Sequence, residues 1–168
     1  MRLPYRYEVV QREGHGGRET KRLTWYDQKL KYVRYQKNDG PFERFDLDGT
    51  VYNEFASFII TRALRFTGGE EIVVPTFADK KRHEVRVSLL GRERLQTLFG
   101  EQPTLKVQPR MHFKGLYDKD GDTVLWITDD QCRVPVEIRS RIVVGSLVAT
   151  LTEYENPACP ELRQRPGP

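Results

Sequence analysis

The sequence predicts a mainly β protein, in which an antiparallel sheet curls into a barrel or half-barrel and carries one short helix. Stretches with period-two alternation recur along the chain, turn residues separate them, and a helical period appears only once. A fold of alternating strands and helices would need several helical segments. We therefore expect residues 1–155 to form a single antiparallel β domain, followed by a proline-rich, loosely held tail over residues 156–168.

The first part of the chain is predicted to form four strands joined by turns. Tyr5, Tyr7 and Val9 alternate with charged residues, as a half-buried strand does. Asn38-Asp39-Gly40 is a strong hairpin signal, because these residue types accept the positive φ of tight turns. The expected strands cover residues 5–9, 18–26, 30–36 and 42–47.

The period then changes to that of a helix. Apolar residues recur at helical spacing at Phe55, Phe58, Ile59, Ala63 and Phe66. This spacing predicts a helix over 55–66, with Thr50 or Asn53 as its N-cap and Gly68-Gly69 at its end. Its apolar face is wide enough to lie over the open end or the flank of a sheet.

Strand signals resume after the two glycines. We expect strands at 71–77, 82–90 and 104–113, with a turn at Asp79-Lys80-Lys81, while 91–99 fits no single period. A loop over 115–122 then leads into a three-stranded meander. Its strands are expected at 124–127, 133–142 and 146–154, with turns at 129–132 and 143–145.

The middle strand of this meander has the clearest alternation in the sequence. Val134, Val136, Ile138 and Ile142 are predicted to lie on one face, and Arg133, Glu137, Arg139 and Arg141 on the other. Gly145 is predicted to take a positive φ in the turn that follows.

Composition limits the class of protein. A chain of 168 residues with 38% hydrophobic and 31% charged residues can bury a core without metal or disulfide support. The net charge of +4 permits contact with an anionic surface without requiring it. No apolar run approaches the length of a transmembrane helix. The N-terminus leads directly into strand-like sequence, so we expect either a cytosolic protein or a chain whose targeting segment was removed.

The chain has two cysteines, Cys132 and Cys159, without the spacing of a metal site. In an oxidising compartment they could pair and tie the tail to the turn at 129–132. In a reducing compartment they would be ordinary thiols, and the sequence leaves both possibilities open.

The meander also carries a resemblance. The motif Trp126-Ile127-Thr128-Asp129-Asp130, the strand Arg133-Val134-Pro135-Val136, the turn Val144-Gly145-Ser146 and the closing run 149–154 are similar to the C-terminal end of the domain of unknown function 3108 family. The resemblance covers residues 18–154. It implies a secreted or periplasmic bacterial protein with an antiparallel barrel-like fold, and no catalytic residues to carry over. Members usually begin with a signal peptide and further strands, from which this chain departs.

Acidic residues give the first candidate for chemistry. Asp118, Asp120 and Asp122 alternate in a loop, as Ca²⁺ ligands can. However, Gly121 comes two positions too early for an EF-hand turn, no bidentate Glu follows, and Lys119 opposes a cation. We therefore expect a solvated hairpin tip, no metal and no cofactor. The same region, Asp118 to Asp130 with His112, is where an alternative hydrolase site would lie, although no serine has an elbow motif.

Aromatic and basic residues give the second candidate. They interleave at Tyr5, Tyr7, Lys31, Tyr32, Arg34 and Tyr35, as on surfaces that bind single-stranded nucleic acid. An ordinary sheet face has the same composition, and nearby acidic residues dilute the charge. We therefore expect no nucleic-acid partner and keep this as an alternative.

The leading prediction is a non-enzymatic protein of the bacterial envelope whose curved sheet binds an apolar or envelope-derived ligand. A half-closed barrel lined by apolar side chains leaves a groove for an acyl chain when those side chains do not fill it themselves. Possible partners are an apolar small molecule or lipid and a membrane or envelope surface. The expected ligand-binding residues are Phe113, Trp126, Val134, Val136, Ile138, Leu147 and Leu151.

Overall fold

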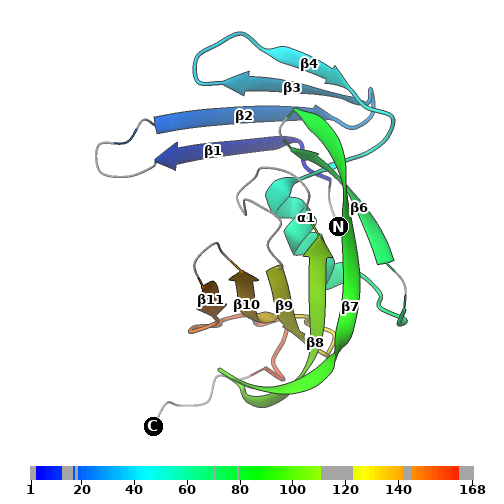
Figure 1. The fold of residues 1–168 in the computed structure, drawn as a ribbon, viewed down its shortest axis with the longest axis vertical. Helices are drawn as coiled ribbons and strands as arrows, with labels where there is room; N and C mark the ends of the chain where they lie inside the picture. Colours follow the sequence, from blue (N-terminus) through cyan, green and yellow to red (C-terminus); the bar gives the residue numbers. More distant parts are fainter. Residues whose placement is uncertain are drawn as a thin grey trace.

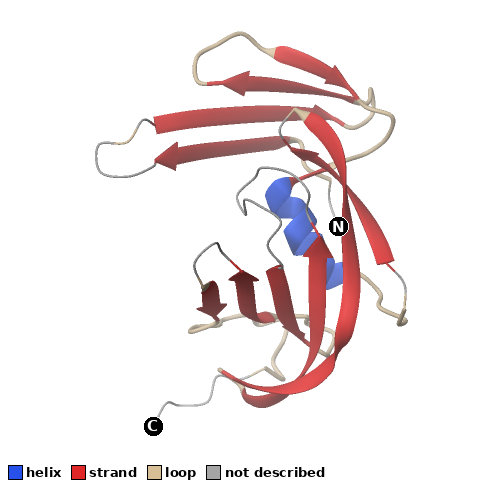
Figure 2. Cartoon of the chain, viewed as in Figure 1, coloured by secondary structure: helices blue, strands red, loops and turns tan. Residues whose placement is uncertain are grey.

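The computed structural model describes residues 3–12, 17, 19–69, 71–78, 80–110, 123–141 and 145–162. The fold is mainly β with one short helix, as the sequence predicts (Figures 1 and 2). The strands form two sheets, one with the order β1-β2-β3-β4 and one with the order β11-β10-β9-β8-β7-β6-β5. The second sheet was not predicted as separate from the first.

The smaller sheet is an antiparallel meander. Its strands are β1 (Arg6–Arg12), β2 (Glu19–Asp27), β3 (Tyr32–Lys37) and β4 (Glu43–Asp46). Asn38 takes a φ of 52° in the turn after β3, and its side-chain oxygen accepts a hydrogen bond from the Lys21 backbone N–H at 3.0 Å. The hairpin predicted at Asn38 is therefore present.

The chain leaves this sheet after β4, because the next strand pairs with a strand of the larger sheet. β5 (Tyr52–Asn53) pairs in parallel with β6 (Glu71–Ala78), the one parallel pair among the described strands. The Gln28 side chain fixes the crossing by donating to the carbonyl oxygens of Pro4 (3.2 Å) and Val51 (2.8 Å) and accepting from the Val51 N–H.

The larger sheet is otherwise antiparallel. Its remaining strands are β7 (Lys81–Thr97), β8 (Gly100–Arg110), β9 (Thr123–Thr128), β10 (Pro135–Arg141) and β11 (Ser146–Thr150). Of the stretch 91–99 that fits no single period, residues 98–99 form the turn to β8, and 91–97 continue β7 past a bulge between Leu89 and Gly91. Such an extra residue bends a strand. Figure 1 shows β7 and β8 curving around the helix, and no described pairing joins β5 to β11, so this part of the chain forms a half-barrel.

The helix is shorter than predicted. α1 covers Glu54–Ile60, a 3-10 turn, η1, covers Thr61–Ala63, and the backbone is extended at Leu64. Asn53 is the N-cap, accepting from the Ala56 N–H at 2.6 Å. The expected continuation to Phe66 is wrong because residues after η1 pack against the sheet in extended form. Gly68 and Gly69 have positive φ, but they lie in the turn before β6 and not at the helix end.

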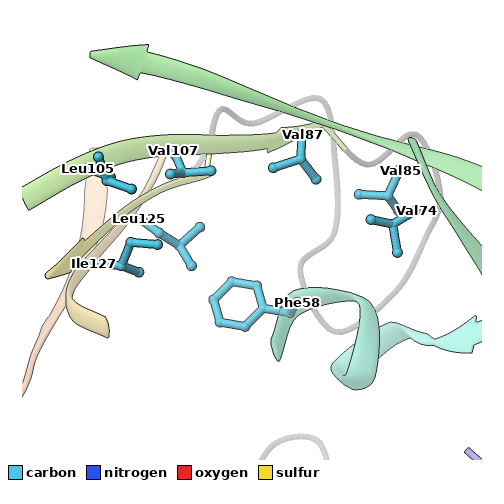
Figure 3. Close-up of a cluster of buried hydrophobic side chains, with 8 residues drawn as sticks. All are labelled: Phe58, Val74, Val85, Val87, Leu105, Val107, Leu125 and Ile127. Atoms are coloured by element: carbon cyan, nitrogen blue, oxygen red, sulfur yellow. The ribbon is translucent and has the colours of Figure 1, made fainter. Parts of the chain in front are cut away.

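The main core lies on the concave face of the larger sheet. α1 lies in this concavity, and Figure 3 shows Phe58 projecting from it toward side chains of β6 to β9. We call this face the trough. Its side chains are buried and pack with Phe58 of α1: they are Val74, Val85, Val87, Leu105, Val107, Leu125 and Ile127.

A second cluster covers the opposite face of the same strands. Successive side chains of a strand point to opposite faces, so Trp126 lies across the sheet from Leu125 and Ile127. It packs with Phe99, Val134, Val136 and Leu162, and we call this group the Trp126 cluster. Leu162 is 7% exposed, so the tail that was expected to be loosely held is packed on the sheet as far as this residue. The larger sheet is therefore covered on both faces.

Gly145 lies just before β11 with a φ of 92°, as the turn prediction requires. We expect Gly145→Val to lower the free energy of unfolding by about 1–3 kcal/mol, because β-branched residues are strongly disfavoured at positive φ. A Cβ added at this position would meet no atom within 4 Å, so the effect would be conformational and not steric crowding. Gly49→Val, at a site equally open but without a positive φ, is the control in thermal unfolding. Equal melting points for the two variants would contradict the assignment.

Candidate functional site

The trough is an apolar concave surface, and α1 and the residues after it fill part of it. Besides Phe58, the partly buried side chains of Ile59, Ile60, Leu64 and Phe66 pack against the buried cluster. Phe55 points away and is 51% exposed. The segment 54–66 therefore presents apolar side chains both to the sheet and to its own outer surface. The sequence showed the helical period, but it did not show that the helix lies inside the concavity of the sheet.

The residues expected to bind an apolar ligand do not share one face. A register irregularity between Pro135 and Glu137 in β10 breaks the predicted alternation. Val136 consequently packs with Trp126 and Val134 on the face opposite the trough, whereas Ile138 packs against the trough.

The other expected ligand-binding residues are also dispersed. Leu151 packs against the Trp126 cluster, and Leu147 is 57% exposed on the edge strand β11. Phe113 lies outside the described residues. Of the expected residues that the structure describes, only Ile138 therefore packs against the trough, whose lining comes from β6 to β9.

The turn between β9 and β10 is built by side-chain hydrogen bonds. The Asp130 carboxylate accepts from the Thr128 hydroxyl at 2.8 Å and from the backbone N–H groups of Cys132 (2.8 Å) and Arg133 (2.9 Å). The Thr128 hydroxyl oxygen in turn accepts from the Val134 N–H at 2.9 Å. Short acidic and hydroxyl side chains stabilise turns in this way. The Asp130 carboxylate therefore has a structural role in this turn.

Three arginines and a second aspartate complete the turn. Arg62 of η1 donates to the carbonyl oxygens of Arg133 (2.6 Å) and Cys132 (2.9 Å), which joins the helix to the turn. Asp129 pairs with Arg92 at 3.1 Å and lies 3.9 Å from the Arg133 guanidinium. Arg133 itself has a φ of 49°. Sequence reasoning missed Arg62, since nothing local indicates a partner 70 residues away.

The same turn carries a disulfide. Cys132 and Cys159 are bonded, with their Cα atoms 6.1 Å apart and a sequence separation of 27. The bond fixes the segment 151–162 over the Trp126 cluster. Of the two alternatives that the sequence left open, the structure therefore has the paired cysteines. Glu161 lies beside the two sulfur atoms, but cysteines joined in a disulfide have no thiolate to offer a metal ion.

Comparison with known protein families gives a match that includes the motif at 126–136. The family model described as Protein of unknown function (DUF3108) matches residues 2–152. The chain belongs to this family. Searches of the curated proteins and of the solved structures found no match. In this DUF3108 chain, the family-like motif at 126–136 provides a buried tryptophan, a turn and the strand that follows, each with a structural role.

Trp126, the first residue of the motif, is surrounded by charges on the face opposite the trough. Its indole N–H donates to the Glu93 carboxylate, and this hydrogen bond, with Lys106 nearby, lowers the pKa of Glu93 below its usual value. The Lys106 ammonium and the Arg139 guanidinium lie 5.1 Å and 5.0 Å from the ring centroid. Trp126 is 5% exposed, so this arrangement shields it.

The aromatic and basic residues of the alternative nucleic-acid surface are divided between two faces. Tyr7 and Tyr35 face the interior between the sheets, whereas Tyr5 is 73% exposed. On the outer face, Tyr32 is stacked by Arg44 at 4.1 Å, and Arg34 lies 5.3 Å from the Phe42 ring. Lys31 occupies a turn with a φ of 54°. The sequence interleaves these residues because a strand alternates, not because they form one platform.

The acidic loop lies outside the described residues, as do His15 and His112. The structure therefore says nothing of Asp118, Asp120 or Asp122. His83 is described, and its Nε2 lies 3.1 Å from the Ala78 carbonyl oxygen. None of the described helices is long and apolar enough to span a membrane.

A pocket that sequence reasoning did not anticipate lies between the two sheets. It is lined by Tyr7, Val9, Arg22, Thr24, Tyr26, Tyr35, Glu54, Phe77, Ala78 and Lys80. Burial raises the pKa of Tyr26 far above its usual value, and the charge of Glu54 adds to the effect, so this hydroxyl stays neutral. Nothing in the sequence indicated this pocket, because Arg22, Thr24 and Tyr26 lie on the strand face opposite the apolar Leu23 and Trp25.

We expect Asp130→Ala to lower the free energy of unfolding by about 2–3 kcal/mol, because two backbone N–H groups and a hydroxyl lose their acceptor. Asp130→Asn should cost less, since its amide oxygen can still accept. Asp46→Ala, whose carboxylate is bound by Arg44 on the surface, is the control. Denaturant unfolding of the three variants measures this order, and a negligible effect of Asp130→Ala would contradict the structural role of the motif.

Proposed function

We propose that this DUF3108 protein is a non-enzymatic component of the bacterial envelope that holds an apolar chain, such as a fatty-acyl group, in the trough beside α1. The observation that carries the proposal is the apolar concave face of the larger sheet, covered by a short segment whose own apolar side chains are only partly buried. A ligand chain would lie against the outer apolar side of this segment or take the place of Phe58.

The covering segment is suited to movement. α1 has seven residues, and isolated helices shorter than about 12 residues are marginal in water. It is held to the sheet chiefly by apolar contacts, the Asn53 cap and the Arg62 hydrogen bonds. Apolar contacts can be exchanged for contacts with a ligand of similar chemistry at small cost. The exposed ring of Phe55 would gain burial in the same step.

The disulfide supports the envelope as the compartment. Stable disulfides form in oxidising environments such as the periplasm and are rare in the cytosol. Both cysteines of the chain are engaged in this one bond. Fractionation of the native host, with thiol alkylation before and after reduction, tests the localisation. Free thiols together with recovery in the cytosolic fraction would overturn it.

Native mass spectrometry of delipidated protein with dodecanoate and palmitate tests the ligand. We expect one acyl chain per protein, and we expect Phe55→Ser combined with Leu64→Ser to weaken binding while the protein stays folded. Leu30→Ser removes an apolar side chain that is 70% exposed in the turn between β2 and β3, and it should leave binding unchanged. Absence of any adduct, or equal loss in both variants, would reject the trough as the site.

A further inference from the structure

The pocket between the two sheets carries a second, independent inference. Its walls come from three parts of the chain: the inner face of β1 to β3, the first turn of α1, and the end of β6 with the turn after it. Tyr26, Tyr35, Thr24, Phe77 and Ala78 are buried there. These elements are far apart in sequence, so the pocket exists only in the folded protein.

Arg22 is the unusual member of the lining. In the strand register it lies opposite Val9 on β1 and Lys37 on β3, on the same face as the pocket tyrosines. One terminal nitrogen, Nη2, donates to the Gln11 side-chain oxygen at 3.0 Å. Its Nε is buried and has no acceptor among the residues that the structure describes. A buried donor without a partner is costly, so this N–H favours a ligand that supplies an acceptor.

The charges around the pocket select the kind of acceptor. Arg22 and Lys80 line it together with one carboxylate, Glu54. Lys80 is already bound to Glu43 at 2.6 Å, whereas no described carboxylate pairs with Arg22. Glu54 acts on Tyr26, which lies four residues along β2 from Arg22, roughly 13 Å at strand spacing. The two ends of the pocket therefore differ in charge.

We propose that this pocket binds the carboxylate of a small organic acid at its Arg22 end. The planar guanidinium can donate from Nε and from the second hydrogen of Nη2 to the two oxygens of a carboxylate, which is its best-matched partner. The tyrosine-rich wall receives the body of the molecule. Arg22 is the one cation of the lining that no described carboxylate pairs with, so a carboxylate monoanion matches it charge for charge, whereas a phosphate dianion carries one charge more.

Titration calorimetry with benzoate tests the proposal, with benzamide as the uncharged counterpart of the same shape. We expect benzoate to bind one to one and benzamide to bind more weakly. Arg22→Gln should raise the Kd for benzoate by about tenfold or more, as loss of a charge-assisted pair does. Arg12→Gln is the matched control, because Arg12 lies on the outer face of β1 and is paired with Glu19.

Several results would overturn the proposal. These are the absence of benzoate binding, equal affinity for benzamide, tighter binding of inorganic phosphate, or an unchanged Kd in Arg22→Gln. If Arg22→Gln fails to fold, the comparison of benzoate with benzamide in the wild-type protein, together with Lys37→Gln, decides the matter. Loss of positive charge at Lys37 should weaken benzoate without changing benzamide. Acyl-chain binding in the trough should be unaffected by either variant, so this proposal and the trough proposal can fail separately.

Discussion

Replacing Cys132 and Cys159 together by serine is expected to lower the free energy of unfolding by about 3–4 kcal/mol. The bond closes a loop of 27 positions, and opening it restores the chain entropy of the unfolded state. It also releases the segment 151–162 from the face of the sheet where Leu162 packs with Trp126. Loss of the disulfide should therefore lower the global stability and also change the environment of Trp126.

Denaturant unfolding followed by tryptophan fluorescence measures both effects. Reducing the wild-type protein should reproduce the change seen in the double variant, and the reductant should have no effect on the double variant itself. Equal stability of the oxidised and reduced wild-type protein would contradict the role assigned to the disulfide.

Leu105→Ala is expected to destabilise the protein by about 3–5 kcal/mol, because it removes a fully buried side chain from the centre of the trough and leaves a cavity. Leu30→Ala is the control for the loss of an equal side chain, and at an exposed position it should change stability by less than about 0.5 kcal/mol. Thermal or denaturant unfolding measures the difference.

A further result follows if the trough accepts an acyl chain. Dodecanoate should stabilise Leu105→Ala more than the wild-type protein, since a ligand that occupies the new space restores part of the lost burial. A small effect of Leu105→Ala on stability would show that the trough is not the core of the larger sheet.

The strands could be predicted from the sequence because alternation and turn residues are local. The hairpin at Asn38, the turn at Gly145 and the strands around them depend on backbone preferences that each residue type carries with it. The division into two sheets could not be predicted from the sequence, because it depends on β5 pairing with β6 and on Gln28 joining distant segments. These contacts have no local signal.

The site was predicted only in part, for a similar reason. Period-two alternation places residues on faces only while the register is regular, and the irregularity between Pro135 and Glu137 moves Ile138 to the face opposite Val136. The helix ended early because Leu64 is extended and Leu64 and Phe66 pack against the sheet, a tertiary contact that the local helical period does not contain. The aspartates of the motif were correctly assigned to a turn, and the structure adds the partners of each.

Hydrogen exchange of the backbone amides of α1 and η1, with and without dodecanoate, tests most directly whether the trough is a ligand site with a movable cover. In the free protein these amides should exchange faster than those of β8 and β9, and adding dodecanoate should change exchange in residues 54–66 while leaving the smaller sheet unaffected. Protection of α1 equal to that of the central strands, unchanged by any acyl chain, would contradict the account.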